Sequence, residues 1–133
     1  DRTRFYTSFT DRDGNVIVPS YFYSIAEDKD GTVWLGTDKG PLLMTNVSKV
    51  FDNTYTCTRV KIPRNDGTIL ADYLLDNEEI RAIAIDAANR KWIGTGNSGV
   101  YLLSANGRET IHHFTVDNSP LSSNKIESIV IAK

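Results

Sequence analysis

Short apolar runs alternate with polar turns along the whole chain. The runs 22–27 and 80–85 carry β-branched and aromatic residues, and each ends in a four-residue polar turn, 28–31 or 86–89. Runs of this length, bounded by Gly, Asn and Asp, are typical of β-strands. A helical period is suggested only at 71–79, where we expect a connector with at most one turn of helix. The pattern therefore predicts a chain of antiparallel hairpins.

The polar turns have the composition of tight hairpin loops. Their last positions, Gly31 and Asn89, are residue types that tolerate a left-handed backbone. A type I turn followed by a left-handed residue is a common loop of this kind. Each turn therefore joins a first strand to a returning strand, and a second hairpin follows. The later strands are expected at 32–37, 41–45 and 54–62 in the first copy, and at 90–95, 100–104 and 109–115 in the second, with a strand remnant at 8–10.

One segment of the chain occurs twice, which indicates a stack of similar modules. Residues 24–37 return as 82–95, 58 positions later, and a truncated third copy at 126–131 repeats 80–85 after 46 positions. Repeats of about 40 to 50 residues, rich in strand formers and Gly turns, are typical of propeller blades, and about four to eight blades close a ring. We therefore predict an all-β fold, a β-propeller fragment of about two four-stranded antiparallel blades with partial strands at both ends.

The repeat also predicts how the chain is divided. Extra residues separate the first two copies, chiefly at 64–79. An insertion in the loop of one blade usually gives that blade a contact surface that the other blades lack. The chain stops in mid-repeat, so we expect a piece of a longer protein. The predicted segments are the end of a preceding blade with its connector (1–20), a first blade (21–63), an inserted inter-blade loop (64–79), a second blade (80–116), and a connector with the first strand of a next blade (117–133).

Composition permits a packed globular piece and excludes some partners. The 133 residues are 40% hydrophobic and 24% charged, with a formal net charge of −2. Lys and Arg are scattered singly, without a basic stripe that could hold phosphates in a row, so we expect no nucleic-acid partner. The one cysteine, Cys57, cannot form an internal disulfide and is expected to be a buried, inert thiol. No hydrophobic run approaches the roughly 18 residues of a membrane span.

Several residues of the repeat are expected to serve the structure. Trp34 and Trp92 are predicted to be largely buried between blades, because a large ring serves as core more often than as a ligand platform. The aspartates that open the two turns are predicted to stabilise the hairpins. With the glycines of the two Gly-Thr pairs, the predicted structural residues are Trp34, Trp92, Gly36, Gly94, Asp28 and Asp86.

The repeated positions resemble a known family, the two-component regulator propeller repeat. They are Ile25, Asp28, Gly31, Trp34–Thr37 and Gly40 in the first copy, and Ile83, Asp86, Trp92–Thr95, Gly99 and Val100 in the second. The phrase at 113–126 is also similar to the inter-blade connector of that family and of related PorZ-like surface propellers of type IX secretion. Departures from the pattern at Asn89, Ser98 and Pro41 affect loops and leave the blades intact.

The resemblance implies a function as well as a fold. Such repeats build the periplasmic sensor part of bacterial hybrid histidine kinases, which implies a periplasmic or cell-surface location and a glycan-like ligand held by loops. The related PorZ-like propellers imply instead a surface or secretion accessory that docks proteins. A third interpretation, a propeller lyase, finds no paired acid and base at interpretable spacing. We therefore expect a non-catalytic binding module, not an enzyme: first the extracytoplasmic sensor region of such a kinase, with a carbohydrate ligand, and as the alternative a PorZ-like accessory with a protein partner.

Metal, cofactor and nucleophile chemistry find no support in the sequence. Asp-x-Asp-Gly occurs at 28–31 and 11–14, but position 12 of a calcium loop would fall on Lys39 or Phe22 instead of a carboxylate. The adjacent histidines at 112–113 lie in a predicted strand, so their side chains point to opposite faces. No Gly-x-Ser-x-Gly turn is present. We therefore predict no metal site, no cofactor and no catalytic residue.

The remaining candidates for function lie in loops. In a four-stranded meander, the turn between the second and third strands lies on the same face as the blade-to-blade crossover, and loops on a rigid scaffold commonly carry function. The inserted region adds a tyrosine that the pattern leaves exposed. The predicted ligand-binding residues are Asp38, Lys39, Asp66, Tyr73, Asn97 and Ser98.

Self-association is also expected. A piece cut between blades uncovers apolar sheet faces and open strand edges, both of which favour contacts between molecules. The runs 5–9 and 126–131 are the expected contacts, since they can complete one another between copies.

Overall fold

Hairpins are the units of the fold. The structure, a computed structural model, describes residues 8–45, 56–63, 67–68 and 70–131. The described residues form strands and no helix, so the prediction of an all-β chain is confirmed, and none of them belongs to a helix that could span a membrane. The strands are β1 (Phe9–Thr10), β2 (Val16–Ile17), β3 (Phe22–Glu27), β4 (Val33–Thr37), β5 (Gly40–Met44), β6 (Lys61–Pro63), β7 (Ala71–Tyr73), β8 (Ile80–Ile85), β9 (Lys91–Thr95), β10 (Val100–Leu103) and β11 (Thr110–Phe114).

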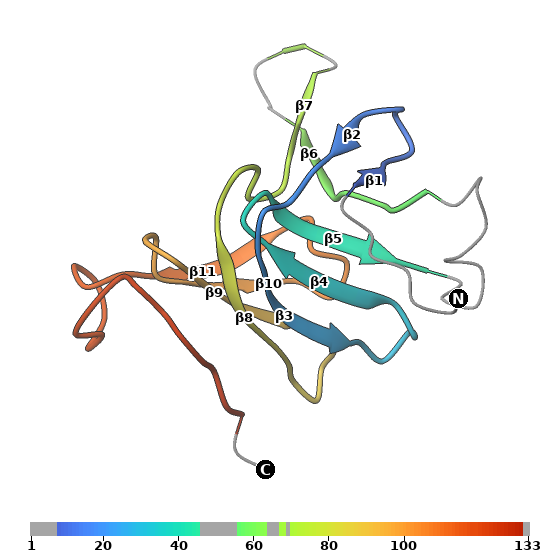
Figure 1. Cartoon of the computed structure of the whole chain (residues 1–133). Helices are drawn as coiled ribbons and strands as arrows, with labels where there is room; N and C mark the ends of the chain where they lie inside the picture. Colours follow the sequence, from blue (N-terminus) through green and yellow to red (C-terminus); the bar gives the residue numbers. More distant parts are fainter. Residues whose placement is uncertain (1–7, 46–55, 64–66, 69, 132–133) are drawn as a thin grey trace.

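Two antiparallel sheets lie side by side and form the body of the molecule (Figure 1). The first sheet has the order β3-β4-β5, and the second has the order β11-β10-β9-β8. Their registers match, because Trp34 lies opposite Ala26 in the first sheet and Trp92 lies opposite Ala84 in the second. The sequence repeat is therefore a structural repeat.

The aspartates at 28 and 86 close the first hairpin of each sheet. The Oδ1 atom of Asp28 accepts hydrogen bonds from the backbone N–H groups two and four residues later, at 2.9 and 3.0 Å, and Asp86 Oδ1 accepts the same two bonds at 2.9 Å. The predicted left-handed positions are observed, with φ of 83° at Gly31 and 62° at Asn89. Asn89 also uses its side chain, since its amide oxygen accepts the backbone N–H of Lys29 at 2.9 Å. The asparagine thus links the turns of the two sheets.

A buried ion pair joins the two sheets. Lys91 has no exposed surface, and its Nζ lies 3.0 Å from Asp28 Oδ2 and donates to the Ala105 carbonyl at 2.6 Å. The same carboxylate accepts the indole N–H of Trp34 at 3.2 Å, and Lys91 Nζ lies 5.3 Å from the centre of the indole. One carboxylate therefore fixes both the tryptophan of its own sheet and the lysine of the next.

The two tryptophans predicted to be buried differ. Trp34 is 1% exposed, in the apolar core shared by the two sheets, as the pattern predicted. Trp92 is only half-buried, and its ring stacks on Phe114 with the centroids 6.2 Å apart. The prediction that Trp92 is buried between sheets is therefore wrong for the part of the chain that the structure describes. The reason is that Trp92 points away from the first sheet, and no further described sheet covers it.

Two glycines allow the next segment to approach each sheet closely. A Cβ atom at Gly36 would lie 2.5 Å from the carbonyl oxygen of Ile80, and one at Gly94 would lie 2.5 Å from Cγ2 of Ile126. Ile126 therefore sits on the second sheet at the place that Ile80 has on the first. The predicted strand at 126–131 is not formed, because these described residues pair with no other strand.

The first sheet lacks the outer strand predicted at 54–62. Of the described part, only Thr58 pairs with this sheet, through two backbone hydrogen bonds of 2.8 Å with Leu43. Lys61–Pro63 instead forms β6 and pairs with β7, because the inserted region supplies a closer partner. The region 71–79 is correspondingly a strand followed by a turn, with no helical turn.

A second short ribbon covers part of the first sheet. The predicted remnant at 8–10 contains β1, which pairs with β2, a strand that the pattern did not predict. Ile17 of β2 joins Leu42 and Cys57 in a small core on the face of the first sheet that points away from the second. Burial raises the pKa of the Cys57 thiol to about 11, so the thiol stays protonated at neutral pH.

Candidate functional site

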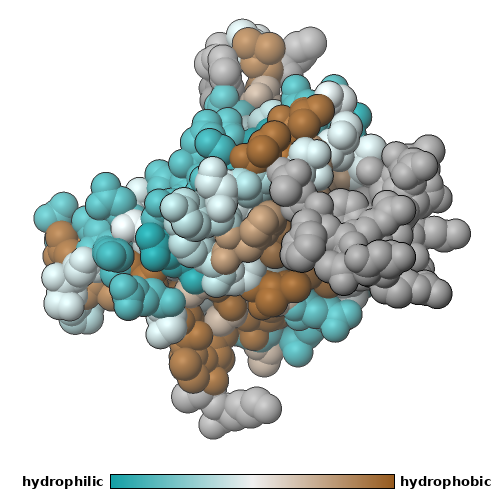
Figure 2. All heavy atoms as spheres, in the orientation of Figure 1, coloured by the Kyte–Doolittle hydropathy of each residue, from teal (hydrophilic) through white to brown (hydrophobic). Residues whose placement is uncertain are grey.

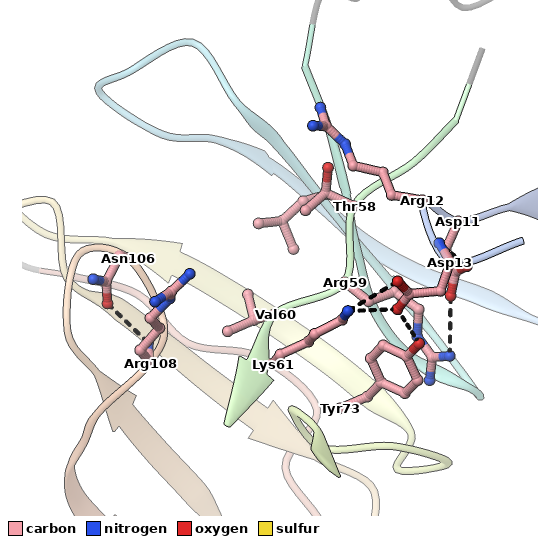
Figure 3. Close-up of a pocket in the computed structure, with 11 residues that line it drawn as sticks. Asp11, Arg12, Asp13, Thr58, Arg59, Val60, Lys61, Tyr73, Asn106 and Arg108 are labelled. Carbon is pink, nitrogen blue, oxygen red and sulfur yellow. Dashed lines mark hydrogen bonds and ion pairs between the residues drawn. The ribbon is translucent and has the colours of Figure 1, made fainter. Parts of the chain in front are cut away.

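A cleft of about 350 Å³ opens where the β6–β7 ribbon meets two turns (Figure 3). One wall is the β1–β2 turn at 11–13, and the other contains Asn106 and Arg108 of the β10–β11 turn. The segment 58–61 crosses between them, and Tyr73 of β7 closes one side. We call this space the Arg59 cleft, after the residue that organises it.

Arg59 ties three parts of the chain together. Its guanidinium carbon lies 3.8 Å from the centre of the Tyr73 ring, which is a close cation–π contact. Its Nη1 lies 3.6 Å from Asp11 Oδ2, and its Nη2 donates to Asp76 Oδ1 at 2.6 Å. The side chain is 10% exposed, so Arg59 holds the cleft in shape and has little surface left for a ligand.

Tyr73 is held by a second set of polar contacts. Its hydroxyl donates to Asp13 Oδ2 at 2.5 Å and accepts from Asn15 Nδ2 at 2.9 Å, while Lys61 Nζ lies 2.8 Å from the same Asp13 oxygen. The hydrogen bonds from Lys61 and Tyr73 lower the pKa of Asp13. The bond to Asp13 raises the pKa of Tyr73 to about 12. Neither group therefore exchanges a proton readily near neutral pH, which suits binding better than acid–base catalysis.

Two arginines of the cleft have side chains without a polar partner among the described residues. Arg12 and Arg108 are exposed, and neither side chain makes an ion pair or hydrogen bond with the described residues. Arg12 belongs to the β1–β2 turn and Arg108 to the β10–β11 turn, so they come from different walls (Figure 3). A ligand in the cleft would therefore meet free positive charge from two sides.

A second cavity, of about 420 Å³, also reaches Arg59. Its lining includes Lys39, Asp76 and Asn77, together with apolar residues at 16–18. Asn77 has a left-handed φ of 62° and donates its backbone N–H to the Lys39 carbonyl at 3.1 Å. Arg59 is thus the shared wall of two neighbouring cavities.

The structure does not gather the six predicted ligand-binding residues in one place. Tyr73 lines the Arg59 cleft and Lys39 lines the second cavity, whereas Asp66 lies outside the described residues. Asp38 is occupied by the chain itself, since its Oδ1 accepts the backbone N–H groups of residues 20 and 21 at 2.9 and 3.2 Å. The other two lie on the β9–β10 turn.

That turn is mainly held by local contacts. Ser98 donates its backbone N–H to Thr95 Oγ1 at 2.8 Å and its hydroxyl to the Glu78 carboxylate at 3.1 Å. Asn97 is exposed beside it. His113 Nε2 lies 2.6 Å from the Ser98 carbonyl, not from its hydroxyl, so the pair is no activated nucleophile. The described residues contain no group of three or more His, Cys, Asp or Glu side chains that could hold a metal ion.

Comparison with known proteins agrees with the fold. Residues 17–39 match the family described as two component regulator propeller. The chain is also similar to the solved structure of PorZ, described as an essential bacterial surface component of the type-IX secretion system of Porphyromonas gingivalis, with 33% identity and a TM-score of 0.80. The match covers 95% of this chain but only 17% of the PorZ chain. No curated protein sequence matches the chain. The predicted resemblance to the regulator propeller repeat and the propeller fold are therefore confirmed.

Proposed function

We propose that this chain is a non-catalytic binding segment of an extracytoplasmic bacterial β-propeller, and that it binds its ligand in the Arg59 cleft. The observation that carries the proposal is the position of the insertion. The residues that interrupt the repeat supply β7, which pairs with β6, and these two strands bring Lys61 and Tyr73 to a cleft whose other walls are the β1–β2 turn and the β10–β11 turn of the second sheet. An insertion that creates a concave surface on a rigid repeat is a common origin of a binding site.

The chemistry of the cleft supports binding without catalysis. The Asp13 carboxylate and the Tyr73 phenol are already hydrogen-bonded to each other, and their contacts lower the pKa of Asp13 and raise that of Tyr73, away from neutrality in both cases. Within the described lining, the guanidinium groups of Arg12 and Arg108 have no ion pair or hydrogen bond of their own, and such groups recognise ligands through charge and directed hydrogen bonds.

Two kinds of host protein fit such a segment. The family match at 17–39 supports a periplasmic sensor of a hybrid histidine kinase, with a carbohydrate ligand. The 33% identity to PorZ over 95% of this chain supports a surface propeller that docks proteins, and the similarity spans far more of the chain. We therefore place the surface propeller first and the sensor second.

Filling the cleft tests the proposal without changing its charge. Thr58 lines the cleft, so Thr58→Trp is expected to abolish saturable heat when peptides and oligosaccharides are titrated into the chain by calorimetry. Thr110→Trp, at an exposed position of β11, is the matched control and is expected to bind like the unmodified chain. Binding that survives Thr58→Trp unchanged, or that Thr110→Trp removes equally, would place the ligand elsewhere and contradict the proposal.

A further inference from the structure

The charge of the Arg59 cleft is unbalanced. Among the described residues, four cationic side chains line it, together with the two carboxylates of Asp11 and Asp13. Those carboxylates are engaged by Arg59 and Lys61, and Arg59 is further paired with Asp76. The positive charge left over belongs to the arginines at 12 and 108. An occupant that neutralises both must itself carry negative charge.

The geometry of these arginines favours carboxylates on an extended chain. The two side chains come from separate turns on different walls, so a single compact anion need not meet both, whereas successive acidic side chains can. Guanidinium groups bind carboxylates through paired N–H donors, which gives direction as well as charge. The floor between them includes Leu43 and Val60, both largely buried in the core, which suits the apolar stems of such side chains.

A sugar is a poorer fit to the same walls. A sugar ring is typically held by an open aromatic face and by several free hydrogen-bonding groups. Here the aromatic ring that the described lining contains, Tyr73, is covered on one face by the Arg59 guanidinium at 3.8 Å. Its hydroxyl is occupied on both sides, by Asp13 and Asn15. The aromatic face and the phenol that a sugar would use are therefore already engaged within the protein, and the groups that remain available include the cationic Arg12 and Arg108.

We propose that the Arg59 cleft docks an acidic peptide segment of a partner protein, whose carboxylates pair with Arg12 and Arg108. The inference rests on the proposed function and adds the chemistry of the partner. Arg59, Lys61 and Tyr73 act as the scaffold that keeps the two arginines apart and oriented.

A blocked hexaglutamate peptide is the probe, titrated by fluorescence anisotropy or calorimetry against a hexaglutamine peptide of equal length. Hexaglutamate is expected to bind roughly tenfold more tightly, and Arg12→Ala and Arg108→Ala are each expected to weaken it about two- to fivefold, as exposed ion pairs do. Raising the salt from about 0.05 to 0.5 M is expected to weaken the binding as well. Both arginines are exposed and pair with none of the described residues, so these variants are expected to melt like the unmodified chain.

Lys29→Ala is the matched control, because Lys29 is an exposed cation on the β3–β4 turn that does not line the cleft. It is expected to leave hexaglutamate binding unchanged. Equal weakening by Lys29→Ala would show a general charge effect and overturn the proposal. Binding of oligogalacturonate without hexaglutamate, still blocked by Thr58→Trp, would overturn the acidic peptide but keep the proposed function. Failure of every probe to respond to Thr58→Trp would overturn both.

Discussion

At the scale of single residues, Trp34 and Trp92 hold equivalent positions in different surroundings. Each indole N–H donates to the aspartate that closes its own hairpin, at 3.2 and 3.1 Å. The second sheet covers Trp34, whereas Trp92 stacks on Phe114 and lines a cavity with residues of the following connector. The same sequence motif is therefore expected to contribute unequally to the free energy of unfolding in the two sheets.

Replacing each tryptophan by alanine measures this difference. Trp34→Ala is expected to lower the free energy of unfolding by about 3 to 5 kcal/mol, because it opens a cavity between the sheets. Trp92→Ala is expected to lower it by less than half as much, since Trp92 is only partly buried. Urea unfolding followed by circular dichroism gives both values. Equal losses for the two variants would contradict the stacking of the sheets described above.

The cleft shows which site residues a sequence can reveal. Tyr73 was predicted because the insertion marks it, but Arg12, Arg59 and Arg108 were not, since single arginines spread over the chain carry no local signal. Pairings between distant segments bring them to one cleft. The Asp-x-Asp-Gly motif at 11–14 was the nearest hint, and it indicated a turn only.

At the scale of elements, the hairpins were predictable and the ribbons were not. The strands of both sheets follow from turn residues that act within a few positions, such as Asp28 and Gly31. The pairing of β6 with β7 depends on the inserted region, and the loss of an outer strand from the first sheet follows from it. No local feature of the sequence at 54–62 indicates that Lys61–Pro63 pairs with β7 and not with the first sheet.

The ion pair of Asp28 with Lys91 is a buried charged contact that joins the two sheets. Burial by itself would raise the pKa of Asp28, but hydrogen bonds from Lys91, from the backbone and from Trp34 hold it below its ordinary value. The stability that this carboxylate supplies is present above its unfolded pKa, about 3.9, and is lost as the pH falls through its lower folded value. Acid is therefore expected to loosen the two sheets.

Asp28→Asn tests the pair directly. It leaves the buried Lys91 charge without its counter-ion, so the expected loss is about 3 to 5 kcal/mol in the free energy of unfolding. Asp86→Asn is the matched control, because its partner Arg90 is partly exposed and the expected loss is about 1 kcal/mol. Adding Lys91→Met to Asp28→Asn is expected to restore most of the stability, measured by thermal unfolding. No recovery in the double variant would mean that the buried charge is not the cause.

At the scale of the whole molecule, two apolar sheet faces remain open. Ile25 is 70% exposed on the face of the first sheet that points away from the second, and Val130 is 91% exposed near Trp92 on the far face of the second sheet. Figure 2 shows apolar atoms at the surface of the face in view, between polar regions. Exposed apolar patches of this kind mark surfaces that pack against another protein surface.

The central structural claim is that the chain is a run of equivalent sheets, each presenting one face to the next, so the two open faces should fit one another between copies. The most direct measurement is sedimentation velocity at several concentrations. The chain is expected to associate, Ile25→Asp and Val130→Asp are each expected to be monomeric alone, and their mixture is expected to form a dimer through the one intact pair of faces. Ile111→Asp, on an exposed isoleucine of β11, is expected to associate normally. A chain that stays monomeric at every concentration, or a mixture of the two variants that forms no dimer, would contradict the claim.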